Sequence, residues 1–169
     1  MQYVLYILVL VILGVGFCWI SDRLTNVMFR RRNPPEKIAA DRHAYEQRLL
    51  QPDWSFYEHH LQRPAPPALR ELFADHQLIV TQDIDYSKGE RISRFEALDE
   101  DGLIDTRPWL GFDVVALATS DFGDPIYLRP GSAESDAVYI THHDGGDTDE
   151  LAPDVATFLQ RLRVANRSA

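Results

Sequence analysis

The sequence predicts an α+β fold with a mostly antiparallel sheet flanked by helices, preceded by one transmembrane helix. Three observations lead to this prediction. Residues Tyr3 to Ile20 contain no charged side chain, and at about 1.5 Å per residue such a run crosses most of a bilayer core. Segments with helical spacing follow as far as residue 76. Short apolar segments separated by turn residues come next, and a last helical pattern closes the chain.

The basic residues after the apolar run indicate its orientation. Arg23 and the run Arg30 to Arg32 follow it, whereas only the amino terminus precedes it. Because basic residues are retained on the cytoplasmic side, we expect a single-pass membrane protein with a cytoplasmic body. A cleaved signal peptide is the alternative, although the run lacks a charged n-region and a small-residue cleavage motif. Cys18 is the one cysteine, so no intrachain disulfide can form.

The chain divides into three predicted regions. We expect a transmembrane helix over residues 1–21, a basic helical stalk over 22–51 and an α+β domain over 52–169. The stalk contains a break at Asn33-Pro34-Pro35 and then a polar helix from Glu36 to Leu50. Pro52 interrupts that helix and marks the expected start of the domain.

Three further helices are predicted in the domain. The first runs from Trp54 to Leu61, with Asp53 as its N-cap. The second runs from Pro67 to about His76, because proline suits the first helical turn. The last runs from about Pro153 to Val164, and its apolar side chains recur at helical spacing. These side chains are Val155, Phe158, Leu159 and Leu162.

The strands are predicted between turns rich in aspartate, glycine and proline. Turns are expected around residues 85–89, 99–102, 120–124 and 130–132, and residues 142–149 are expected to form a loop. The segments between these turns are short and apolar or alternate in polarity, as strands do. They cover residues 78–84, 91–98, 114–118, 126–128 and 137–141.

Charge is distributed unevenly along the chain. From Asp22 to Arg48 there are seven basic and four acidic residues, whereas from Leu49 onward there are ten basic and twenty-two acidic ones. A body with a net charge of about −12 is repelled by phosphate backbones, so direct binding of nucleic acid is excluded. The expected partners are a basic protein and, through residues 3–20, the membrane.

Acidic residues in the predicted turns are the candidate partner-binding residues. They are Asp121, Asp124, Asp144, Asp147, Asp149 and Glu150. For Gly123-Asp124 there is also a structural reading, in which glycine adopts a positive φ and aspartate caps the turn. The loop of residues 142–150 has two readings as well, a solvated acidic loop or a docking surface for a basic partner.

No catalytic, cofactor-binding or metal-binding residue is predicted. His142 and His143 follow one another at a strand end and would point to opposite faces, and the acidic residues after them lack EF-hand spacing. Ser120-Asp121 lacks a nucleophile elbow. Five aromatic residues are assigned to the core rather than to a ligand platform. They are Trp54, Trp109, Phe112, Phe122 and Tyr139.

Four segments together resemble the SUKH superfamily, which includes the yeast cell-wall regulator Knr/Smi family. They are the tryptophan-led helix Trp54-Ser55-Phe56-Tyr57-Glu58 with Pro66-Pro67-Ala68-Leu69-Arg70-Glu71-Leu72, the strand Leu110 to Ala116, the turn and strand Asp121 to Leu128, and the strand Val138-Tyr139-Ile140 with the helix after Leu151-Ala152-Pro153. The resemblance covers residues 53–163. The family often has an Asn-Gly-Gly-like turn where this chain has Asp75-His76-Gln77.

The resemblance implies a domain without a catalytic site. Its bacterial relatives include immunity proteins that neutralise toxins and regulatory adaptors. We therefore expect a membrane-anchored, non-enzymatic protein-binding domain of the SUKH type, whose acidic surface covers the basic surface of a toxin or of a regulatory partner. The alternative is a membrane-tethered, metal-dependent hydrolase that uses the loop of residues 142–150.

Overall fold

The computed structural model describes residues 33–87, 90–130 and 136–168. The chain divides into two compact units, Met1–Ala44 and Tyr45–Ala169. Helix α2, Pro35–Leu49, spans the boundary between them. Residues 1–32 lie outside the described residues, and with them the predicted region 1–21 and residues 22–32 of the stalk over 22–51. In the described part of the stalk, α2 agrees with the polar helix predicted from Glu36 to Leu50.

The prediction of a transmembrane helix requires correction. Within the part of the chain that the structure describes, no helix is long and apolar enough to cross a membrane. The longest helix of that part, α2, has only 15 residues, whereas a span needs about 20 apolar ones. This finding also contradicts the predicted single-pass membrane localisation. The transmembrane helix and the membrane localisation are therefore not carried further. The apolar run 3–20 lies outside the described residues.

The second unit begins with the last turn of α2 and a series of short helices. The Tyr45 hydroxyl donates to the Phe95 carbonyl oxygen. Arg48 binds Asp99 through two hydrogen bonds of 2.9 and 2.7 Å, which ties this turn to the unit. Three helices follow, α3 (Trp54–Leu61), α4 (Pro67–Ala74) and α5 (His76–Ile79). As predicted, Asp53 caps α3.

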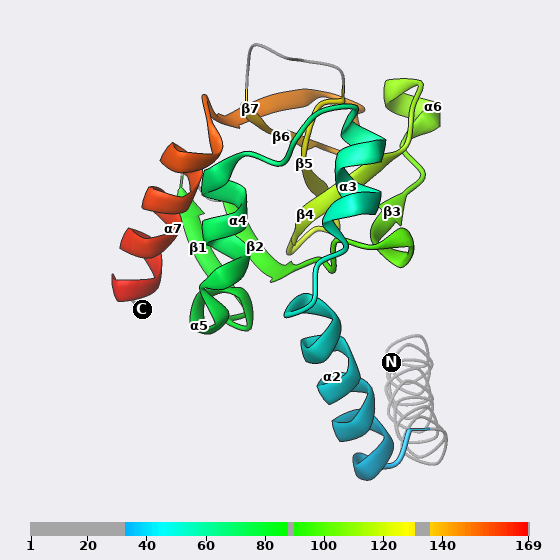
Figure 1. Ribbon diagram of the computed structural model, residues 1–169, viewed down its shortest axis with the longest axis vertical. Helices are drawn as coiled ribbons and strands as arrows, with labels where there is room; N and C mark the ends of the chain where they lie inside the picture. The colour runs from blue at the N-terminus through cyan, green and yellow to red at the C-terminus, as the bar shows by residue number, and fades with distance from the viewer. Residues whose placement is uncertain (1–32, 88–89, 131–135, 169) are drawn as a thin grey trace, which may run out of the picture. The chain divides into compact units, whose positions relative to one another are not determined.

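A curled antiparallel sheet forms the centre of this unit (Figure 1). The strand order is β1-β2-β4-β5-β6-β7, and β3 pairs with the first half of β4. Two short helical segments, η1 (Glu100–Gly102) and α6 (Arg107–Leu110), flank β3. The strands are β1 (Ile84–Ser87), β2 (Glu90–Phe95), β3 (Leu103–Ile104), β4 (Val114–Ser120), β5 (Pro125–Leu128), β6 (Val138–Thr141) and β7 (Thr148–Ala152). All seven residues of β4 are buried, which makes it the central strand.

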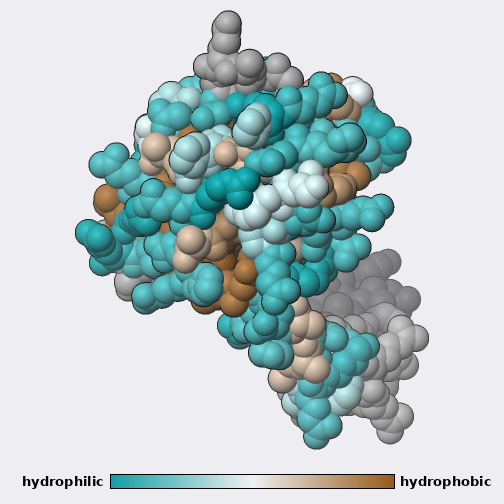
Figure 2. Space-filling view, in the orientation of Figure 1, coloured by the Kyte–Doolittle hydropathy of each residue, from teal (hydrophilic) through white to brown (hydrophobic). Residues whose placement is uncertain are grey.

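The last helix, α7, runs from Val155 to Ser168 and packs against α4, β1 and β7. Its apolar stripe is buried as the spacing predicts. Figure 1 shows α4 and α7 beside β1 and β2. Together with one face of the sheet these helices enclose the core, whose largest fully buried side chains include Tyr57, Phe95 and Phe158. The face drawn in Figure 2 is mostly hydrophilic, with small hydrophobic patches.

The structure therefore has the α+β class with an antiparallel sheet, but it differs from the predicted elements at several points. The strand β3 and the short helix α6 were not predicted, and β1 occupies part of the predicted turn 85–89. The predicted strand 78–84 does not form, because Leu78 and Ile79 belong to α5, which Asp75 caps by accepting a hydrogen bond from the Leu78 backbone N–H at 3.2 Å. Within this range only Ile84 is in a strand, as the first residue of β1. The predicted loop 142–149 ends in the strand β7. Only Ala152 of β7 is buried, so its apolar signal is weak.

Candidate functional site

Two hairpin turns lie at the same end of the sheet. The β4–β5 turn covers residues 121–124 and the β6–β7 turn covers residues 142–147. Ile126 pairs with Ile140 in antiparallel register, so the start of β5 lies beside the end of β6. We call this end, with its two turns and the first residues of β7, the turn edge.

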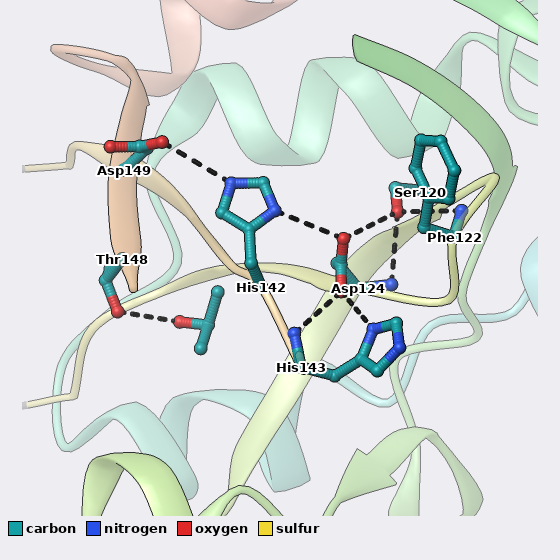
Figure 3. A network of polar contacts seen from close by, with 8 residues as sticks. Ser120, Phe122, Asp124, His142, His143, Thr148 and Asp149 are labelled. Atoms are coloured by element: carbon teal, nitrogen blue, oxygen red, sulfur yellow. Dashed lines mark hydrogen bonds and ion pairs between the residues drawn. The ribbon is translucent and has the colours of Figure 1, made fainter. Parts of the chain in front are cut away.

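Asp124 joins the two turns across the sheet (Figure 3). Its Oδ1 accepts hydrogen bonds from the His143 backbone N–H at 2.9 Å and from the His143 ring Nδ1 at 2.6 Å. Its Oδ2 lies 3.3 Å from both the Ser120 Oγ and the His142 Nδ1. The side chain is only 4 % exposed, so a buried carboxylate holds the β6–β7 turn against the β4–β5 turn.

These hydrogen bonds keep the Asp124 carboxyl ionised. Burial by itself raises the pKa of this carboxyl, but hydrogen bonds from the His143 backbone, the His143 ring and the His142 ring outweigh that effect. The pKa of Asp124 is consequently lowered from its usual value of 3.8. A buried charge is tolerated here because it is hydrogen-bonded from several sides.

Ser120 organises the inside of the β4–β5 turn. Its Oγ accepts hydrogen bonds from the backbone N–H groups of Phe122 at 3.2 Å and Asp124 at 3.1 Å. Its backbone oxygen accepts from the Gly123 N–H at 3.1 Å. Gly123 has a φ of 90°, as predicted for this glycine, and an L side chain would be strained there. The turn is thus held by its own backbone and by one buried hydroxyl.

His142 lies between two carboxylates. Its Nδ1 is 3.3 Å from Asp124 Oδ2 and its Nε2 is 3.4 Å from Asp149 Oδ2. Only a doubly protonated imidazole ring can donate toward both carboxylates. This ring links the first residues of β7 to the buried clamp around Asp124.

The Ser120 hydroxyl is not arranged as a serine nucleophile. Ser120 is buried, and its hydroxyl faces Asp124, whereas a serine nucleophile needs an adjacent base such as histidine and access to substrate. Among the described residues no group of three or more His, Cys, Asp or Glu side chains could hold a metal ion. The metal-dependent alternative stays a hypothesis from the sequence.

The structure separates the predicted partner-binding residues into two groups. Asp124 is buried and supports the turns from inside. The other five predicted side chains are exposed at the turn edge or on the adjoining part of β7, and they are Asp121, Asp144, Asp147, Asp149 and Glu150. The Asp121 backbone lies beside β2, since its N–H donates to the Arg91 carbonyl oxygen, and the Arg91 Nε is paired with Asp85 at 2.8 Å. Their role as partner-binding residues stays a prediction.

Two exposed aromatic residues, Phe122 and Trp109, were assigned wrongly from the sequence. Phe122 was predicted to lie in the core, yet its exposed fraction is 71 %, and that of Trp109 is 42 %. The turn chemistry of Ser120-Asp121-Phe122-Gly123-Asp124 is the signal that could have corrected this. A residue in the middle of so tight a turn projects away from the sheet.

Comparison with known proteins adds no assignment, because no protein-family model, curated protein or solved structure matches this chain. The resemblance to the SUKH superfamily accordingly stays a prediction based on the four segments quoted above.

Proposed function

We propose that this chain is a non-enzymatic protein-binding module that recognises a basic protein through the turn edge. The observation that carries the proposal is the clamp around Asp124. One buried carboxylate fixes two turns side by side while the neighbouring acidic side chains point to solvent. Rim charges of this kind accelerate association and select partners of opposite charge.

The charge of the body supports the same proposal. From Leu49 onward acidic residues outnumber basic ones by twenty-two to ten, so long-range attraction would steer a basic partner toward the unit. By covering the partner's basic surface, the turn edge would sterically block that surface from other ligands. A toxin-neutralising immunity protein and a regulatory adaptor, the two roles that the SUKH resemblance implies, both fit this mechanism.

The proposal is tested by comparing two triple variants with equal changes in charge. The edge variant combines Asp144→Asn, Asp147→Asn and Asp149→Asn. The control variant combines Glu100→Gln, Asp101→Asn and Asp105→Asn, which flank β3 and thus lie near the start of β4, at the opposite end of the sheet.

Each full-length variant is used to capture proteins from the native host at low and at high salt. We expect basic proteins to bind the wild type and the control variant at low salt, to be released at high salt, and to bind the edge variant much less. Equal capture by the two triple variants would refute recognition through the turn edge.

A further inference from the structure

Phe122 is the most exposed of the large hydrophobic side chains that are exposed in the described part of the chain. Its exposed fraction is 71 %, compared with 60 % for Val164, 47 % for Ile38 and 42 % for Trp109. Single apolar side chains on a surface are common and need no special explanation. What distinguishes Phe122 is the rigidity of the backbone that presents it and the charge that surrounds it.

The backbone on both sides of Phe122 is fixed by hydrogen bonds. The N–H groups of Phe122 and Asp124 donate to the Ser120 Oγ, and the N–H of Gly123 donates to the Ser120 backbone oxygen. Asp124 is in turn held by the backbone and ring of His143. Figure 3 shows Phe122 beside this network. A backbone held in this way loses little conformational entropy when a partner covers the turn.

The surroundings of Phe122 are anionic. Asp121 precedes it and is exposed, and the adjoining β6–β7 turn exposes Asp144 and Asp147. An aromatic side chain surrounded by charged groups is the arrangement of an interface hot spot with its polar rim. The face of a phenylalanine ring also attracts Lys and Arg side chains.

We propose that Phe122 is the anchor of the turn edge and inserts into an apolar socket, rimmed by lysine or arginine, on the basic partner. This inference rests on the proposed function and specifies the partner's surface. The exposed carboxylates would repel phosphate groups of nucleic acid and of anionic lipid, and a second copy of this body, with its net charge of about −12, would be repelled as a whole. A basic protein is the partner that can contact the Phe122 ring with apolar side chains and pair with the surrounding carboxylates.

The test uses a library of small folded domains randomised on one face, selected on the full-length chain with excess Phe122→Ser chain as competitor. A parallel selection uses the wild type with Trp109→Ser as competitor, because Trp109 is an exposed aromatic residue outside the turn edge. Affinities of the selected binders are then measured for wild type, Phe122→Ser, Phe122→Leu, Trp109→Ser and the edge variant.

We expect the first selection to yield binders enriched in lysine and arginine around an apolar centre. Their affinity should fall about 30-fold or more with Phe122→Ser, be largely kept with Phe122→Leu and be unchanged with Trp109→Ser. For the edge variant, the affinity should fall less than it does for Phe122→Ser, and the remaining affinity should depend less on salt. Urea unfolding of each variant excludes a loss of folding as the cause.

Three outcomes overturn the inference. Binders that depend on Phe122 but show no enrichment in basic residues would refute the basic socket. Basic binders that are lost with the edge variant but not with Phe122→Ser would refute the anchor and leave the proposed function standing. Self-association of the wild type that Phe122→Ser abolishes would identify a second copy, rather than a basic partner, as the occupant.

Discussion

Replacing Asp124 with asparagine tests the clamp directly, because the substitution keeps the shape of the side chain and removes its charge. The amide oxygen can take the place of Oδ1 and accept from His143, although as a weaker acceptor. The amide NH2 then takes the place of Oδ2, where it meets the Ser120 Oγ, which already accepts two backbone N–H groups, and the His142 Nδ1. The amide NH2 and the Ser120 hydroxyl are then both hydrogen-bond donors, and the Oδ2 oxygen that accepted from Ser120 is gone.

The expected loss follows from these contacts. Hydrogen bonds to a charged group contribute about 1.5–3 kcal/mol, and Asp124→Asn weakens two bonds and replaces the remaining ones, so we expect the free energy of unfolding to fall by about 2 kcal/mol. For a unit of this size that corresponds to a fall in Tm of roughly 6–12 °C. Asp149→Asn is the matched control. That side chain is 73 % exposed and pairs with the outer nitrogen of His142 at 3.4 Å, so its loss should change stability by no more than about 0.5 kcal/mol.

The pH dependence has a definite sign. The pKa of Asp124 in the folded state lies below its usual value of 3.8, so the ionised carboxylate stabilises the fold above that value. This stabilisation is lost as the pH falls through the folded-state pKa. The difference in unfolding free energy between wild type and Asp124→Asn should therefore be largest above about pH 5 and should shrink on further acidification. Urea unfolding followed by circular dichroism measures it. A difference below about 0.5 kcal/mol near neutral pH, or one that grows on acidification from pH 5, would refute this account of the clamp.

Three more substitutions, one of them with a matched control, test the packing of the described residues. Tyr57→Phe removes a buried hydroxyl that has no hydrogen-bond partner among those residues. The free energy of unfolding should therefore stay equal or rise by up to about 1 kcal/mol. A clear loss of stability in urea unfolding would show that the hydroxyl is hydrogen-bonded. Gly102→Ala places a Cβ 2.1 Å from the Ala97 carbonyl oxygen, so we expect a loss of about 1–3 kcal/mol. Gly145→Ala is the control, because the nearest atom to its added Cβ outside the chain neighbours would be 3.4 Å away, and it should change the melting temperature little. Equal effects of Gly102→Ala and Gly145→Ala would contradict the predicted clash. Phe122→Ser should leave the melting temperature unchanged, because the ring packs against little; a marked fall would show that it belongs to the core.

Local signals in the sequence were sufficient for the elements whose stability is local. The Asp53 cap of α3 and the helical stripe of α7 depend on residues three or four positions apart, and both were predicted. The positive φ of Gly123 follows from the turn chemistry around it. These features require no knowledge of what lies across the sheet.

The features that were missed depend on long-range pairing. β7 is an edge strand whose exposed residues are polar, so its pattern is that of a loop until β6 pairs with it. The burial of Asp124 depends on His143, which is nineteen positions away and reaches it only because β5 and β6 pair. One-dimensional reasoning groups Asp124 with its acidic neighbours, although the fold gives it a different role.

This division of roles bears on what the turn edge is for. A protein that needed acidic residues only for solubility could place them on loops of any conformation, without a buried charge and its network of donors. Here a carboxylate that would be destabilising if unpaired is fully engaged, and the turn that it holds presents an apolar ring and an acidic neighbour to solvent. Holding an exposed phenylalanine rigidly adds little to folding stability, because the ring removes little apolar area from water. The clamp around Asp124 therefore stabilises the fold, and the exposed ring on the turn that it holds is available for the recognition proposed above.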